Sequence, residues 1–199
     1  MKINRLALRL CMCALVLLRA LSLYADGKDS LSRKMIHMAG IDVKPAYVFP
    51  THEFFAGNNA TFSPIRKNLS VHLKYGFKFA PDTYFGRMYP HAVQGIGVGY
   101  NTFFHSSELG NPWSVYAFQT SRIASLTPRL SLDYEWNFGA SFGWKKYDAE
   151  SNPYNRVVGS KMNAYIHLSF LLNWQLDAQT NLRAGIGATH FSNGNPGYP

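Results

Sequence analysis

The chain has 199 residues, is 47% hydrophobic and 15% aromatic, and carries a formal net charge of +9 at pH 7. Its Lys and Arg residues are scattered singly, in no block or stripe, so the charge does not indicate a nucleic-acid partner. Cys11 and Cys13 lie in one apolar run near the N-terminus, and the histidines lack metal-ligand spacing. The sequence therefore predicts no disulfide in the rest of the chain, no bound metal and no other cofactor.

Residues 1–25 are typical of a secretory signal. Lys2, Arg5 and Arg9 precede the apolar run 10–18, and Ala25 ends a plausible cleavage site. The apolar run is too short to span a bilayer as a helix. We therefore expect a secreted chain whose mature part, residues 26–199, forms one domain.

The mature chain alternates apolar and polar residues almost throughout and shows no convincing 3.6-residue period. This pattern predicts an all-β, antiparallel fold, with residues 26–40 polar and loosely ordered. Turn clusters rich in Gly, Pro, Asn and Asp separate the expected strands. These strands cover residues 41–50, 69–79, 95–104, 113–126, 130–145, 162–176 and 181–192.

The segment 130–145 alternates most clearly. One face carries Leu130, Leu132, Phe138 and Phe142, and the other carries Asp133, Glu135 and several Gly and Ser residues. A soluble barrel would turn the apolar face inward, whereas an outer-membrane barrel would turn it outward. Three features favour the membrane: the length of the strands, the small residues on the polar face, and the aromatic residues near strand ends.

We therefore expect a transmembrane β-barrel in the outer membrane of a Gram-negative bacterium, with its apolar face against lipid. Asp133, Glu135 and Arg183 should point into the lumen. Bacterial single-chain barrels have an even number of strands, so eight strands are expected although about seven can be counted. The sequence ends in a turn-like segment, 195–199, which suggests that a further strand follows it.

The last expected strand carries a candidate catalytic pair. His190 and Ser192 are two residues apart, so their side chains share one face of an extended strand. A hydroxyl beside an imidazole is the minimum arrangement for nucleophilic acyl transfer, and we expect the two groups within or near hydrogen-bond reach. Leu182 and Ile186 lie on the same face, which favours an apolar substrate. The alternative is that His190 and Ser192 merely close a strand before a turn.

Asn193 and Gly194 follow the serine directly. Their backbone N–H groups, or the Asn193 amide, are candidates to stabilise an oxyanion. An ordinary Asn-Gly turn explains the same two residues equally well.

The segment 189–195, Thr-His-Phe-Ser-Asn-Gly-Asn, resembles the His-x-Ser-Asn active-site motif of the outer-membrane lipid A deacylases. This family comprises the PagL-type lipid A 3-O-deacylases and longer Bacteroidetes relatives often labelled acyloxyacyl hydrolases. Segments 110–116, 133–139 and 158–163 are similar to the longer relatives. The resemblance implies that Ser192 is the nucleophile and His190 the general base in hydrolysis of an ester-linked acyl chain of lipid A.

The resemblance also implies a glutamate that orients the histidine. This glutamate would follow the serine in the sequence, at a position beyond Pro199. The expected partners are thus lipid A, or whole lipopolysaccharide, and the surrounding outer-membrane lipid. The main alternative is a non-catalytic outer-membrane barrel with a structural or adhesion role. A channel is disfavoured because side chains fill the lumen of an eight-stranded barrel.

Overall fold

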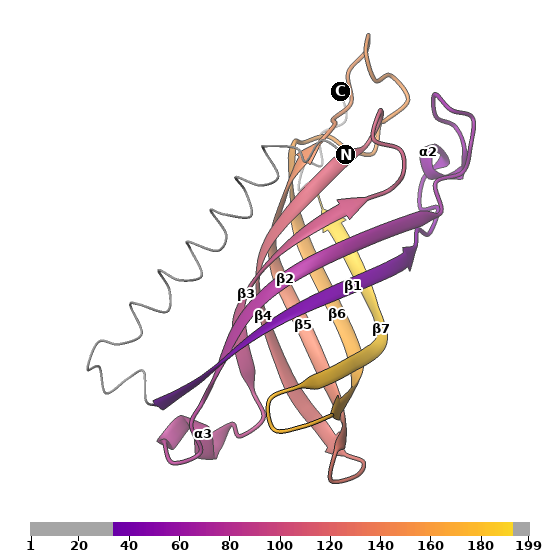
Figure 1. Ribbon diagram of the computed structural model, residues 1–199. Helices are drawn as coiled ribbons and strands as arrows, with labels where there is room; N and C mark the ends of the chain where they lie inside the picture. Colours follow the sequence, from indigo (N-terminus) through magenta and orange to yellow (C-terminus); the bar gives the residue numbers. More distant parts are fainter. Residues whose placement is uncertain (1–33, 193–199) are drawn as a thin grey trace, which may run out of the picture.

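The computed structural model describes residues 34–192, which form seven antiparallel strands curled into a half-barrel (Figure 1). Each strand pairs with the next one along the chain, in the order β1 to β7. The strands are β1 (Met35–Tyr47), β2 (Lys67–Phe79), β3 (Val93–Thr102), β4 (Gly110–Ser125), β5 (Leu130–Trp144), β6 (Met162–Gln175) and β7 (Asn181–Ser192). The all-β antiparallel prediction is confirmed.

The structure corrects two details of that prediction. Strand β1 begins at Met35, inside the segment expected to be loosely ordered, and ends at Tyr47. Its first residues pair with the end of β2, from Met35 opposite Phe79 to Gly40 opposite Lys74, so the ladder continues despite the weak alternation. Two single-turn helices, α2 (Glu53–Ala56) and α3 (Tyr84–Met88), are too short to produce a 3.6-residue period in the sequence.

The apolar face of the sheet points outward. Phe138 and Phe142 are 59% and 41% exposed, whereas Asp133 and Glu135 are 6% and 1% exposed. The same division holds in neighbouring strands, as the outward Leu73 and the buried His72 and Lys74 of β2 illustrate. The predicted orientation of the two faces is confirmed. No helix among residues 34–192 is long and apolar enough to cross a membrane.

Charged side chains pair inside the lumen. The Lys74 ammonium lies 2.6 Å from an Asp42 carboxylate oxygen and also donates to Glu135. The Arg183 guanidinium lies 3.4 Å from Glu135 and 3.6 Å from Asp42. Since Asp42 belongs to β1 and Arg183 to β7, this lumen cluster connects the two outermost strands of the sheet.

The lumen histidines are hydrogen-bonded to side chains. The ring of His72 bonds to the Ser70 hydroxyl at 3.0 Å and to the Tyr116 hydroxyl at 3.0 Å. His167 bonds to the Thr189 hydroxyl at 2.8 Å.

The two ends of the sheet differ. The loop end carries the connections 48–66, 103–109 and 145–161, and the turn end carries 80–92, 126–129 and 176–180 (Figure 1). A cluster of buried apolar residues closes the loop end of the lumen. It contains Phe54, Ile65, Phe103, Leu109, Trp144 and Val158.

Polar contacts join the three loops at the loop end. The backbone N–H of Ala60 donates to the Glu108 carboxylate at 2.9 Å, and the Asn155 amide donates to the Glu108 carbonyl at 2.7 Å. At the turn end, the backbone N–H groups of Gln179 and Thr180 donate to the Asp177 carboxylate at 2.7 and 2.8 Å. These bonds lower the pKa of Asp177 and close the β6–β7 turn.

We predict that Gly97→Val destabilises the fold. A Cβ atom at Gly97 would lie 2.4 Å from the ring of Tyr116, which fills the lumen beside β3. Overpacking of this kind typically costs about 1–3 kcal/mol, and here the rigid ring cannot move away without disturbing His72. Urea unfolding of the refolded protein should detect the loss. Ala117→Val, on the exposed outer side of β4, is the matched control and should leave the unfolding free energy nearly unchanged.

Candidate functional site

His190 and Ser192 lie at the loop end of β7, on the outer face of the sheet. In the β6–β7 ladder, His190 is opposite Ile166 and Ser192 is opposite Ala164. Ile166 points outward and is 42% exposed, so its partner His190 projects to the same side. His190 is exposed and Ser192 is half-buried. Strand parity therefore brings the two side chains together on the face that the sequence predicted.

The imidazole and the hydroxyl are not hydrogen-bonded to each other among the contacts of residues 34–192. Their Cα atoms are separated by two residues of extended chain, about 6.8 Å along the strand. An imidazole ring turned along the strand can shorten this separation, and catalytic hydrogen bonds are often loose in unliganded enzymes. Asn193 and Gly194, the candidate oxyanion residues, lie outside the described residues.

Phe191, between the two candidates, points the other way and packs in the lumen. Its ring centroid lies 4.9 Å from that of Trp144, 5.6 Å from that of Tyr165 and 6.2 Å from that of Phe103. Aromatic pairs at these separations add stabilisation beyond the burial of area. Because alternate residues of a strand point to opposite faces, burial of Phe191 forces His190 and Ser192 outward.

Two further contacts hold this part of β7 against β6. Thr189 shares a hydrogen bond with the lumen residue His167. Gly187 approaches β6 so closely that an added Cβ atom would lie 2.7 Å from the Cβ atom of Ser169. The strand that carries the candidate pair is therefore fixed from its inner side. Parity analysis of the sequence alone could have identified Phe191 and Thr189, because they alternate with the candidates.

The outer surface beside the pair has an ordered pattern of large and small side chains. Ser192 lies in a cross-strand row with Ala164 and Ala140. His190 lies in the next row, with Ile166 and Phe138. A strip of small apolar side chains therefore leads across β5 and β6 to the serine, with a row of large side chains beside it.

A second histidine on the outer face was not singled out by the sequence. His37 of β1 is exposed, and its Nδ1 lies 2.7 Å from the Tyr75 hydroxyl. This pair lies near the turn end, because His37 is opposite Phe77 at the end of β2. It is therefore remote from Ser192. Among residues 34–192, no three His, Cys, Asp or Glu side chains group in a way that could hold a metal ion.

Comparisons of the chain with protein-family models, with curated proteins and with solved structures found no match.

We predict that Phe191→Ala destabilises the fold by about 3 kcal/mol, since truncation of a packed Phe leaves a cavity in the aromatic cluster. The measurement is the free energy of unfolding of the refolded protein in urea. Phe191→Leu fills part of the space and should cost less. Ile186→Ala is the matched control on the same strand, because Ile186 is 80% exposed on the outer face. A loss for Ile186→Ala as large as that for Phe191→Ala would contradict the anchoring role.

Proposed function

We propose that this protein is an outer-membrane hydrolase that removes an ester-linked acyl chain from lipid A. The observation that carries the proposal is the position of His190 and Ser192, side by side on an apolar outer surface at the loop end. In water, an active site is normally found in a concave pocket. A nucleophile and base on an apolar convex surface are suited to a substrate that arrives through the lipid phase.

Several features support a position in the membrane. The outward residues of β6 run from Met162 to Trp174, about 41 Å along the strand at 3.4 Å per residue. At a barrel-like tilt of about 40°, this distance corresponds to a height of about 30 Å, comparable to a hydrocarbon core of about 30 Å. Trp113 and Tyr100 pack edge to face on the outer side near the loop end, and Trp174 is exposed near the turn end, as in an aromatic girdle.

We further propose that an eighth strand closes the barrel. Within residues 34–192, neither β1 nor β7 has a partner on its outer edge. Unpaired backbone groups are costly in a lipid environment, so a membrane barrel needs these edges satisfied. A strand between β1 and β7 would be antiparallel to both, since these two strands run in the same direction.

The loop end would face the outside of the cell, because outer-membrane barrels have long external loops and short periplasmic turns. Three connections at the loop end span residues 48–66, 103–109 and 145–161, whereas two of the three at the turn end are tight turns. His190 and Ser192 would then lie at the level of the outer leaflet, where lipid A is found.

In the proposed mechanism, His190 accepts the proton of the Ser192 hydroxyl as the serine oxygen attacks the ester carbonyl of the substrate. The tetrahedral intermediate collapses as the protonated imidazole returns the proton to the departing sugar oxygen, leaving the acyl chain on Ser192. Water, deprotonated by His190, then attacks the acyl-enzyme, and the imidazolium returns the proton to the departing Ser192 oxygen as the fatty acid is released. Asn193 and Gly194 are the proposed oxyanion donors. By the family resemblance, a glutamate would orient His190.

The strip formed by Ala140 and Ala164 supports an acyl substrate. Small side chains beside Ser192 leave space on the surface for a hydrocarbon chain, and the larger Phe138 and Ile166 give it an apolar wall.

We predict that Ser192→Ala and His190→Ala each abolish fatty-acid release from lipid A by the full-length protein in outer-membrane preparations. Loss of a nucleophile or of its base typically costs several orders of magnitude in rate, and the double variant should be no worse than either single variant. Mass spectrometry of lipid A from expressing cells is the measurement. Both variants should keep the heat-modifiable mobility of a folded barrel, because neither residue contributes to the lumen packing.

Matched controls are available at exposed positions remote from the candidate pair. His37→Ala removes an exposed histidine near the turn end, and Ser125→Ala removes an exposed serine at the end of β4. Both should retain full release. Lipid A with every acyl chain intact, in cells that contain the correctly folded wild-type barrel, would instead support a non-catalytic structural or adhesion role.

A further inference from the structure

The helix α3 exposes its large apolar residues and buries its smallest one. Gly86 is the only buried residue of α3. In contrast, Tyr84 is 64% exposed, Phe85 52% and Met88 53%, and the C-cap residue Tyr89 is 56% exposed. A surface helix in water normally turns its apolar side toward the protein. A compact cluster of exposed apolar side chains marks a surface that contacts something else.

This cluster is held in place by the backbone beneath it. The Thr83 hydroxyl donates to the Ala80 carbonyl at 2.7 Å and accepts from the Gly86 N–H at 3.0 Å. Gly86 lies so close to the preceding turn that an added Cβ atom would be 1.9 Å from the Ala80 oxygen. The apolar side chains therefore project in a fixed direction, and the helix cannot turn them inward without breaking these contacts.

The cluster is continuous with the apolar outer face of the sheet. The ring centroid of Phe85 lies 5.3 Å from that of Phe79 at the end of β2, and the Phe79 centroid lies 5.9 Å from that of Phe77. Tyr75 and Leu73 continue the same outward row along β2. Figure 1 shows α3 at the foot of this strand, at the turn end.

We propose that α3 is a membrane-interface anchor, a site where the protein binds the lipid surface of the leaflet at the turn end. The proposal rests on the proposed membrane position of the barrel. The side chains of Tyr84 and Tyr89 combine an apolar ring with a hydroxyl, which suits the headgroup region, while Phe85 and Met88 reach the first acyl carbons. Arg87 is exposed on the same turn. Its Nη1 donates to the Asp82 carbonyl at 2.9 Å, which leaves its other N–H groups for lipid phosphates.

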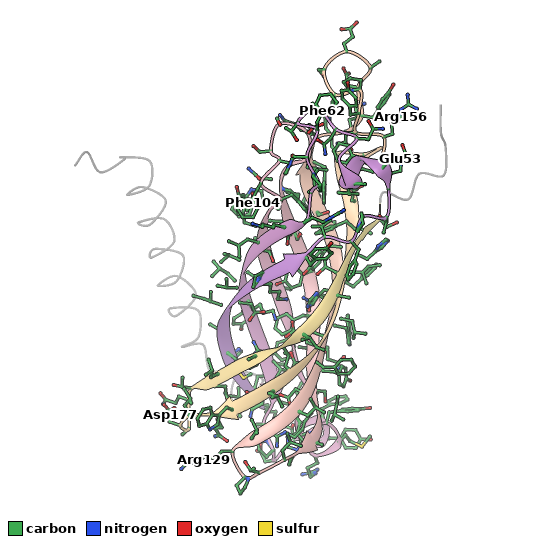
Figure 2. All side chains as sticks on the ribbon, turned by 90° about the vertical axis from the view of Figure 1, so that its right-hand side faces the viewer. Glu53, Phe62, Phe104, Arg129, Arg156 and Asp177 are labelled. Atoms are coloured by element: carbon green, nitrogen blue, oxygen red, sulfur yellow. The ribbon has the colours of Figure 1, made fainter. Side chains whose placement is uncertain are left out.

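Continuity with the outer face favours lipid over a protein partner. A protein that covered only α3 would meet the bilayer directly beside it, because the apolar row runs from α3 onto β2 without a polar break. The other two connections at the turn end are shorter, and each exposes a single leucine, Leu126 or Leu176, beside a charged residue, Arg129 or Asp177 (Figure 2).

Spin labels at three single cysteines test the anchor in the full chain carrying Cys11→Ser and Cys13→Ser, refolded into phosphatidylethanolamine–phosphatidylglycerol vesicles. Met88→Cys reports on α3, Leu73→Cys on the middle of the outer face, and Asp177→Cys on a polar turn at the same end. Collision rates with oxygen, which concentrates in lipid, and with a water-soluble nickel complex are compared. We expect the collision rate with oxygen to exceed that with the nickel complex at positions 73 and 88, and the reverse at position 177.

Each other outcome has a defined meaning. Nickel-dominated collisions at position 88, with oxygen-dominated collisions at position 73, would overturn the anchor and leave the membrane barrel standing. Low collision rates with both reagents at position 88 would indicate a protein contact and would also overturn the anchor. Nickel-dominated collisions at all three positions would overturn the membrane position itself. A further variant, Tyr84→Ser with Tyr89→Ser, should raise the nickel collision rate at position 88 if the tyrosines hold α3 at the interface.

Discussion

Glu135 makes the contacts on which the curl of the sheet depends. It is almost fully buried on β5, where it accepts from Lys74 of β2 and, at 2.9 Å, from the Thr120 hydroxyl of β4, and lies 3.4 Å from Arg183 of β7. Asp42 of β1 joins the same cluster through Lys74 and Arg183. A buried charge is tolerated only when it is paired, so a flatter sheet would leave these groups unpaired in the interior. The lumen cluster therefore favours a closed curvature that brings β1 and β7 toward each other.

A polar lumen determines where every other residue type goes. The paired charges, the histidines, the small residues and a few large rings face the lumen. Because successive residues of a strand point to opposite faces, most aliphatic and aromatic residues, which alternate with them, face outward. This explains why Gly95, Gly97 and Gly99 occur on one face of β3. They leave the space that Tyr116, Phe118 and His72 occupy from neighbouring strands. The apolar exterior is thus the consequence of how the interior is filled.

Much of the division into inward and outward faces can be predicted from the sequence, because the alternation of the two faces depends only on residue order within each strand. The alternation of β5 was enough to assign Asp133 and Phe138 to opposite faces, and the same rule put His190 and Ser192 together. The start of β1 was not predictable in this way, since Met35–Gly40 become a strand only through pairing with β2. Helix α3 was missed for a similar reason: a single turn leaves no periodic signal, and its orientation depends on Gly86 fitting against Ala80.

The candidate site depends on the interior although it lies on the exterior. Phe191 is the residue between His190 and Ser192, and its ring completes the aromatic cluster of Trp144, Phe103 and Tyr165. The pairing of β7 with β6 determines that His190 and Ser192 share one face, and the packing of Phe191 in the lumen holds the strand between them. The packing of Phe191 therefore helps to orient the histidine and the serine, and substitutions in the lumen cluster around its ring should disturb the candidate pair from the opposite face of the strand.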